Sequence, residues 1–96
     1  DHSENLRELE SLIKQSVMDL EASRAKYHTS QMNVKHQRTA NQANQKKYQA
    51  GLLSIIDLLT SNNNLLLAQI ELRNAYLRYQ IQLRQVNFYK GIPYIQ

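Results

Sequence analysis

The stretch YQAGLLSIIDL, residues 48–58, decides how this chain folds. Gly51 lacks a Cβ and is therefore placed to take the left-handed conformation that commonly ends a helix. Ser54 and Asp57 have the spacing of a capping box, with Asp in place of the usual Glu, so a second helix is predicted to begin almost immediately. One helix ends and another begins within about four residues, which makes the two helices antiparallel neighbours.

Apolar residues on both sides of this turn recur every seven residues, as in a coiled coil. Before the turn the row is Leu6, Ile13, Leu20, Tyr27, Val34, Asn41 and Tyr48. Beside it lie Leu9, Ser16, Ser23, Ser30, Gln37 and Asn44. After the turn the row is Leu58, Leu65, Leu72, Tyr79 and Val86, flanked by Ser61, Ala68 and Ala75. Small residues let two helices approach closely, but they bury little area, so each turn contributes modest stability.

The fold class predicted from these rows is all-α, a long antiparallel two-helix coiled-coil hairpin. It forms a single domain over residues 1–96, with a helix at about 4–49, a turn at 50–54, a helix at about 55–90 and a short extended tail at 91–96. Lys90 in the last turn, Gly91 at the cap and Pro93 beyond it end the second helix. Helical arms of about 40 residues would each extend roughly 60 Å.

Further apolar residues widen the stripe of the second helix beyond what a two-helix seam needs. They are Leu59, Leu66, Ile70, Tyr76, Leu77 and Leu83. A stripe of this width predicts contact with more than one neighbour, because a lone hairpin would leave part of it in water. The isolated chain is therefore expected to self-associate or to swap helices.

Composition argues against a thick globular core, because only 7% of the 96 residues are aromatic. The net charge of +4 is uneven: residues 1–21 carry six acidic and two basic side chains, and residues 22–56 carry six basic and no acidic ones. That basic stretch is interleaved with Gln, Asn, Ser and Thr and lacks the aromatic partners of single-strand binders. We therefore expect a solvated helix face and no nucleic-acid partner.

No catalytic, metal or cofactor site is predicted. His2, His28 and His36 are too scattered for a zinc site, and the chain has no cysteine. Nucleophile elbows, glycine-rich phosphate loops and convergent carboxylates are also missing, so no enzymatic activity is expected. Apolar runs are too short to span a membrane. The chain begins at Asp1 without Met, which led us to expect a piece of a larger protein.

Three residues at the turn invite a functional interpretation beside a structural one. Asp57 serves to cap its helix, and it would also form a charged ring at a pore mouth if several copies met about an axis. Leu53 and Leu58 occupy the two positions of a hydrophobic staple when Ser54 is the N-cap. Leu52 has no such structural assignment and is the better candidate for a docking contact, worth roughly 1–3 kcal/mol if a partner buries it fully.

From Tyr48 to Gly91 the sequence reads Y-x-x-G-L-L-S-I-I-D-L-L, then L-L-L-A-Q-I-E-L-R-N-A-Y, and closes at a glycine. This pattern resembles the outer-membrane efflux protein family typified by TolC. Members of that family show the same Tyr, Gly, short turn, Asp-x-Leu and heptad helix in this order. The arm before Tyr48 resembles the incoming helix of the same hairpin, less closely. The resemblance implies a periplasmic coiled-coil hairpin near the C-terminal end of such a protein.

The resemblance also implies partners and a location. Family members trimerise into a channel with a β-barrel in the outer membrane of Gram-negative cells and an α-helical barrel crossing the periplasm. Their hairpin tips meet a periplasmic adaptor protein and, through it, an inner-membrane pump. By this resemblance the chain is a periplasmic portion of an outer-membrane protein, and it does not itself span a membrane.

Carried over by position, the family's adaptor-facing tip falls on Tyr48, Gly51, Leu52, Leu53 and Ser54. Asp57 matches the first acid after the turn and is the pore-facing candidate. A second aspartate that some members carry three residues later is Thr60 here, and an Arg that can follow the turn glycine is Leu53. These two departures favour a docking surface over an electrostatic gate.

Two other interpretations remain open. The chain resembles in part the hairpin of the periplasmic adaptor itself, which also turns through a Gly-x-x-Ser segment, although the adaptor's usual Arg, Leu and Ser tip pattern is not evident. A generic coiled-coil scaffold, or a basic nucleic-acid binder, is the third possibility. Flanking lipoyl-like β-sequence would favour the adaptor, and salt-dependent oligonucleotide binding would favour the nucleic-acid binder.

Overall fold

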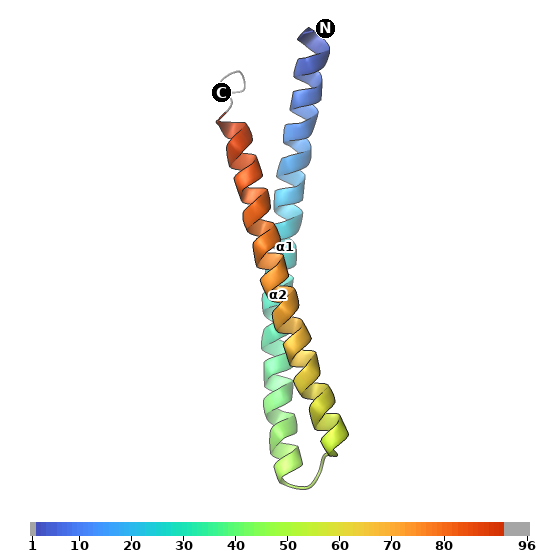
Figure 1. Cartoon of the computed structure of the whole chain (residues 1–96). Coiled ribbons are helices and arrows are strands. Elements are labelled where there is room, and N and C mark those ends of the chain that lie inside the picture. Colours follow the sequence, from blue (N-terminus) through green and yellow to red (C-terminus); the bar gives the residue numbers. More distant parts are fainter. Residues whose placement is uncertain (1, 92–96) are drawn as a thin grey trace.

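The computed structural model describes residues 2–91 and consists of two helices, α1 (His2–Gln49) and α2 (Ile55–Lys90). α1 runs the length of the rod, the chain reverses in a short turn, and α2 returns beside it (Figure 1). The rod measures 72 × 18 × 13 Å. The predicted all-α antiparallel hairpin is confirmed.

The helix bounds follow the capping signals in the sequence. α1 begins at His2, slightly before the predicted residue 4, and ends at Gln49. α2 has the predicted bounds, and its C-cap Gly91 donates its N–H to the carbonyl oxygens of Asn87 and Phe88. The predicted extended tail, including Pro93, lies outside the described residues after Gly91.

The heptad rows form the seam between the helices. The most buried side chains of α1 belong to these rows: Ser16, Leu20, Ser23, Ser30, Val34 and Asn41. Those of α2 are Ser61, Ala68, Ala75 and Val86. Small residues are thus the most deeply buried, while Leu65 and Leu72 are half-buried. The predicted close approach along a narrow seam is confirmed.

The serine side of the seam satisfies its own hydroxyls. Ser16 Oγ donates to the carbonyl oxygen of Ile13 at 2.8 Å, and Ser23 Oγ donates to that of Leu20 at 2.9 Å. Such bonds to the preceding turn allow a serine to be buried without a partner on the facing helix. These two serines therefore bring the helices together without specifying which residues face each other.

An aromatic cluster at mid-length supplies more specific contacts. Tyr27 of α1 lies between two rings of α2, with ring centroids 5.5 Å from Tyr76 and 5.8 Å from Tyr79. The guanidinium carbon of Arg24 lies 5.8 Å from the centroid of the Tyr79 ring. Aromatic pairs and a cation over a ring add to simple area burial, so this cluster helps to fix the register of the two helices.

Both ends of the predicted α1 row are exposed, which corrects the sequence-based expectation of an apolar seam from Leu6 to Tyr48. Leu6 is 43% exposed and Tyr48 is 40% exposed. Leu6 lies where α1 extends past the end of α2, and Tyr48 lies where the chain leaves the seam to enter the turn (Figure 1). The seam closes only where both helices are present.

Candidate docking tip and outer face of the second helix

The turn between the helices is built as the sequence predicts. Gly51 has a φ of +76°, in the left-handed region. Its N–H donates to the Tyr48 carbonyl oxygen at 3.0 Å, and the Leu52 N–H donates to the Lys47 carbonyl oxygen at 2.8 Å. This pair of bonds is the Schellman motif, which satisfies carbonyl groups that a helix end otherwise leaves unpaired.

The start of α2 is capped by a side chain. Ser54 has extended backbone angles, and its Oγ accepts a hydrogen bond from the Asp57 N–H at 3.1 Å. The Ser54 carbonyl oxygen accepts the first helical bond, from the Leu58 N–H at 3.1 Å. The predicted N-cap is confirmed. The turn is therefore held by its own backbone and one hydroxyl, independently of any partner.

The two leucines of the turn differ in exposure as the sequence predicts. Leu53 is half-buried, as is Leu58, the other residue of the proposed staple. Leu52 is 77% exposed. A large apolar side chain at the end of a polar rod is available for contact with another protein.

Two further residues enlarge this apolar tip and were missed by sequence reasoning. Ile56 is 72% exposed and Ile55 is 49% exposed. The signal for them was present, because the heptad register of α2 places position 56 on the side of the helix opposite Leu58 and Leu65. We call Leu52, Ile55 and Ile56 the apolar tip.

The polar residues near the tip lie on the surface. Asp57 is exposed and lies in the first turn of α2, where a carboxylate favours the positive end of the helix. Thr60 is exposed as well, and its Oγ1 donates to the carbonyl oxygen of Ile56 at 3.0 Å. Asp57 thus combines a place at the cap with a charge open to solvent, and whether it faces a pore stays a prediction.

The exposed apolar residues of α2 form a second face rather than a wider version of the seam. Seven of them recur at alternating steps of four and seven residues, so that each row repeats every 11 residues: Ile55, Leu59, Leu66, Ile70, Leu77, Ile81 and Phe88. At 3.6 residues per turn this row lies roughly opposite the seam. Its members are 47–70% exposed. We call these seven residues the outer stripe.

Of the six residues that the sequence assigned to a wide stripe, Leu59, Leu66, Ile70 and Leu77 belong to the outer stripe. Tyr76 and Leu83 lie instead beside the seam, and Tyr76 contacts Tyr27. The expectation that a lone hairpin leaves apolar surface in water is confirmed by these exposures.

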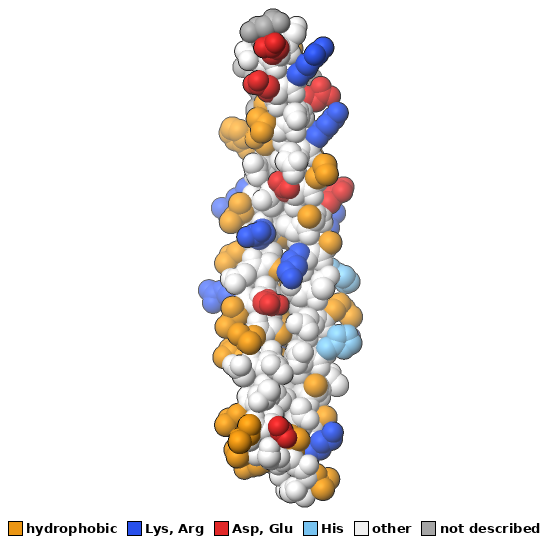
Figure 2. Space-filling view, turned by 90° about the vertical axis from the view of Figure 1, so that its right-hand side faces the viewer, with side chains coloured by type: hydrophobic (Ala, Val, Ile, Leu, Met, Phe, Trp, Pro, Cys, Tyr) orange, Lys and Arg blue, Asp and Glu red, His pale blue; other side chains and the backbone are white. Residues whose placement is uncertain are grey.

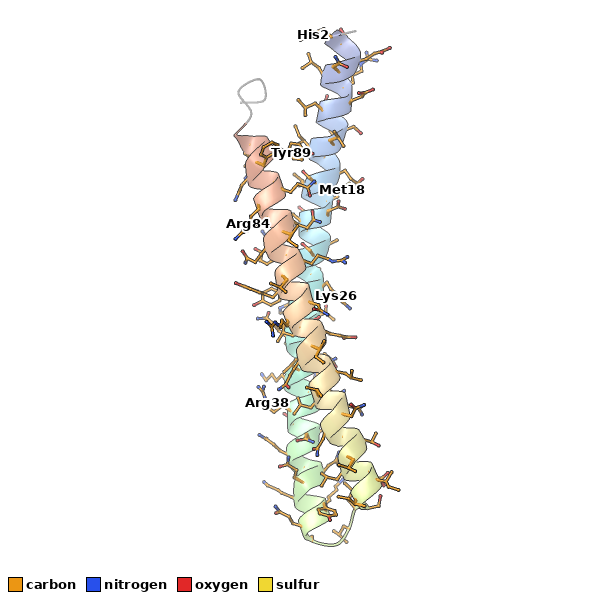
Figure 3. All side chains as sticks on the ribbon, in the orientation of Figure 1. His2, Met18, Lys26, Arg38, Arg84 and Tyr89 are labelled. Carbon is orange, nitrogen blue, oxygen red and sulfur yellow. The ribbon has the colours of Figure 1, made fainter. Side chains whose placement is uncertain are left out.

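Surface charge is distributed differently from the apolar side chains. Figure 2 shows hydrophobic side chains gathered along one edge of the rod, while Lys and Arg are scattered over its length. In Figure 3, Arg84 extends from α2 away from α1. The basic residues between 22 and 56, all exposed, are Arg24, Lys26, Lys35, Arg38, Lys46 and Lys47. They are distributed around α1 and do not form one face.

No metal or ligand site stands out in the part of the chain that the structure describes. Within residues 2–91, no three His, Asp or Glu side chains come close enough together to hold a metal ion. A shallow hollow of about 680 Å³ beside Ala75 is lined by Lys26, Arg78 and Glu71, so its rim carries both signs of charge. Neither helix, over the same residues, is apolar and long enough to cross a membrane.

Comparison with protein-family models, curated proteins and solved structures finds no match to this chain. The functional argument therefore depends on the apolar tip, on the outer stripe, and on the resemblance of the turn sequence described above.

Proposed function

We propose that this chain is a wall element of the periplasmic α-helical barrel of a TolC-like outer-membrane export channel, and that its tip docks onto a periplasmic adaptor protein. In this proposal the channel is a trimer, and the adaptor connects it to an inner-membrane pump. The chain has a structural and binding role and performs no chemistry.

The observation that carries the proposal is the outer stripe. A helix with apolar residues on two opposite faces needs a neighbour on each side. That is the position of a helix in the wall of a barrel, whereas a free two-helix hairpin needs one apolar face for each helix. α1 supplies the neighbour on the seam, and the outer stripe, with Leu59 57% and Ile81 63% exposed, leaves the other side for a further helix.

The apolar tip supports the docking part of the proposal. Leu52 and Ile56 are the two most exposed large apolar side chains at this end of the rod, at 77% and 72%. The Schellman turn and the Ser54 cap hold them in place without help from a partner. A preorganised apolar end needs little ordering on binding, which favours affinity.

The test replaces tip residues in the full-length parent channel. Leu52→Asp and Ile56→Asp are expected to abolish capture of the purified adaptor and drug export, while the trimer still forms on sizing. The matched control is Leu12→Asp, because Leu12 is also an exposed leucine, 54% exposed, near the opposite end of the rod. Unchanged adaptor capture and export in both tip variants would remove docking from the proposal.

A further inference from the structure

The outer stripe runs almost the full length of α2, from Ile55 to Phe88, over about 50 Å at 1.5 Å per residue. Within residues 2–91 the only other helix, α1, lies on the opposite side of α2. We propose that the outer stripe packs against the outer face of α1 in a second copy of this chain, with the two tips at the same end. The proposal rests on the wall role proposed above and names the neighbour.

The register within one hairpin predicts which residues meet between copies. Asn41 lies level with Ser61, and Tyr27 lies level with Tyr76. If two copies align their tips, the same levels hold between neighbours. The residues of α1 that then face the outer stripe are Ala43 opposite Leu59, His36 opposite Leu66, Met32 opposite Ile70 and Ala25 opposite Leu77.

These α1 residues suit large partners. Ala25, Met32, His36 and Ala43 share the side of α1 that lies away from the seam, and all are exposed. Two of the four are alanines, so the Leu and Ile side chains of the outer stripe have room to approach the α1 backbone. Large residues on one helix against small ones on the other allow the two surfaces to interdigitate.

Charge favours α1 as the occupant over a second α2. Residues 2–21 of α1 hold five acidic and two basic side chains, and residues 72–90 of α2 hold four basic and no acidic ones. Tip-aligned copies place these oppositely charged ends side by side, with Glu21 close in level to Arg84. Two α2 helices have less to offer each other, since α2 contains only Asp57 and Glu71 as acids.

The two faces lie on opposite sides of the hairpin, so each copy would bind one neighbour through α1 and another through α2. Such a head-to-tail contact produces a closed ring or an open series and cannot stop at a symmetric dimer. This outcome distinguishes the proposal from any pairing of like faces.

Cross-linking of the full chain provides the test, because the chain has no cysteine of its own. Ala43→Cys with Leu59→Cys, under mild oxidation, is expected to give a series of covalent dimers, trimers and larger species. A bond within one copy is excluded because two packed helices separate the positions, and a disulfide needs Cα atoms within about 7 Å. Ala43→Cys with Ile81→Cys, at different levels, is the matched control and is expected to give no series.

Charge reversal adds a second measurement that does not depend on the introduced thiols alone. In the Ala43→Cys and Leu59→Cys background, Glu21→Arg or Arg84→Glu is expected to lower the rate of cross-linking roughly two- to fivefold, and the double reversal to restore it. Circular dichroism would show that the single variants remain helical.

Three results would overturn the inference: equal series from the matched and control pairs, a dimer formed only by Leu59→Cys with Phe88→Cys, or a chain that stays monomeric at every concentration. Cross-linking and adaptor capture can fail separately. Loss of the series with adaptor capture intact removes only the neighbour, and loss of capture with the series intact removes only the docking function.

Discussion

Asn41 of α1 donates a hydrogen bond from Nδ2 to Ser61 Oγ of α2 at 3.2 Å, and both side chains are buried. The same amide also lies 2.7 Å from Asn62 Oδ1, and Asn41 Oδ1 accepts from Gln45 Nε2 at 2.9 Å. A polar residue at one position of an otherwise apolar heptad row fixes the register of the two helices at some cost in stability. This layer lies between the aromatic cluster and the tip.

The first prediction concerns this layer. Asn41→Ala should lower the free energy of unfolding by about 1–3 kcal/mol, since its buried partners lose their hydrogen bonds. Ser61→Ala should cost less, because Asn41 keeps Asn62 and Gln45. In a double-mutant cycle measured by urea denaturation, the coupling between Asn41 and Ser61 should reach about 0.5–1.5 kcal/mol. Strictly additive effects would show that the observed bond contributes no stability.

Gly51 provides the second prediction. A Cβ at this position would meet no atom within 4 Å, so any cost of Gly51→Ala comes from the left-handed backbone, at φ +76°, and not from a clash. The free energy of unfolding should fall by about 1–2 kcal/mol. Gly51→Asn is the matched control and should cost less, because Asn tolerates this conformation. Equal losses in the two variants, measured by thermal melting, would contradict the explanation.

The cap of α2 provides the third prediction. Ser54→Ala removes the acceptor of the Asp57 N–H and should destabilise the hairpin by about 1 kcal/mol, whereas Ser54→Asp should retain most of the stability. Thr60→Ala is a matched control, because its hydroxyl bonds only to the preceding turn and should contribute almost nothing. Chemical denaturation of the three variants would decide. A loss at Thr60 as large as that at Ser54 would mean that capping is not the cause.

A fourth prediction is a gain in stability at Gln82. Its Oε1 is buried and has no hydrogen-bond partner in the part of the chain that the structure describes. Gln82→Leu should therefore raise the free energy of unfolding by about 1 kcal/mol, through removal of an unsatisfied acceptor and addition of apolar area. Gln85→Leu, at an exposed position nearby, should change it little. A lower melting temperature for Gln82→Leu would contradict the prediction.

The hairpin itself could be predicted from sequence because its signals are local. Seven-residue rows interrupted by Gly51 and restarted at Ser54 require two helices and an antiparallel return. The left-handed glycine and the serine cap each depend on hydrogen bonds within six residues of chain. For such features, neighbouring residues determine the geometry almost alone.

Contacts between the helices were harder to predict, because they depend on register. Asn41 was visible as the one polar residue in its row, but its partner Ser61 follows from how tightly the turn closes. The same holds for Tyr27 and Tyr79, which are 52 residues apart in sequence and have ring centroids 5.8 Å apart. The docking role of the tip remains a prediction, since it depends on a molecule outside this chain.

The outer stripe escaped sequence analysis for a different reason. A search in steps of seven finds the seam and places Leu59, Leu66, Ile70 and Leu77 near it as extra width. Exposure separates them, because residues one position away from a buried Leu58 or Leu65 point to another side of the helix. A second period had to be sought once the first had been removed.

The two periods of α2 have a mechanical consequence. Contacts that repeat every seven residues wind helices around each other in the left-handed sense, and contacts that repeat every 11 residues wind them in the right-handed sense. With the seam and the outer stripe both occupied, α2 would feel opposing torques from its two neighbours. Neither torque prevails along the helix, so α2 would behave like a straight stave in a cask, resisting the twist that would shorten the rod or close the space it surrounds.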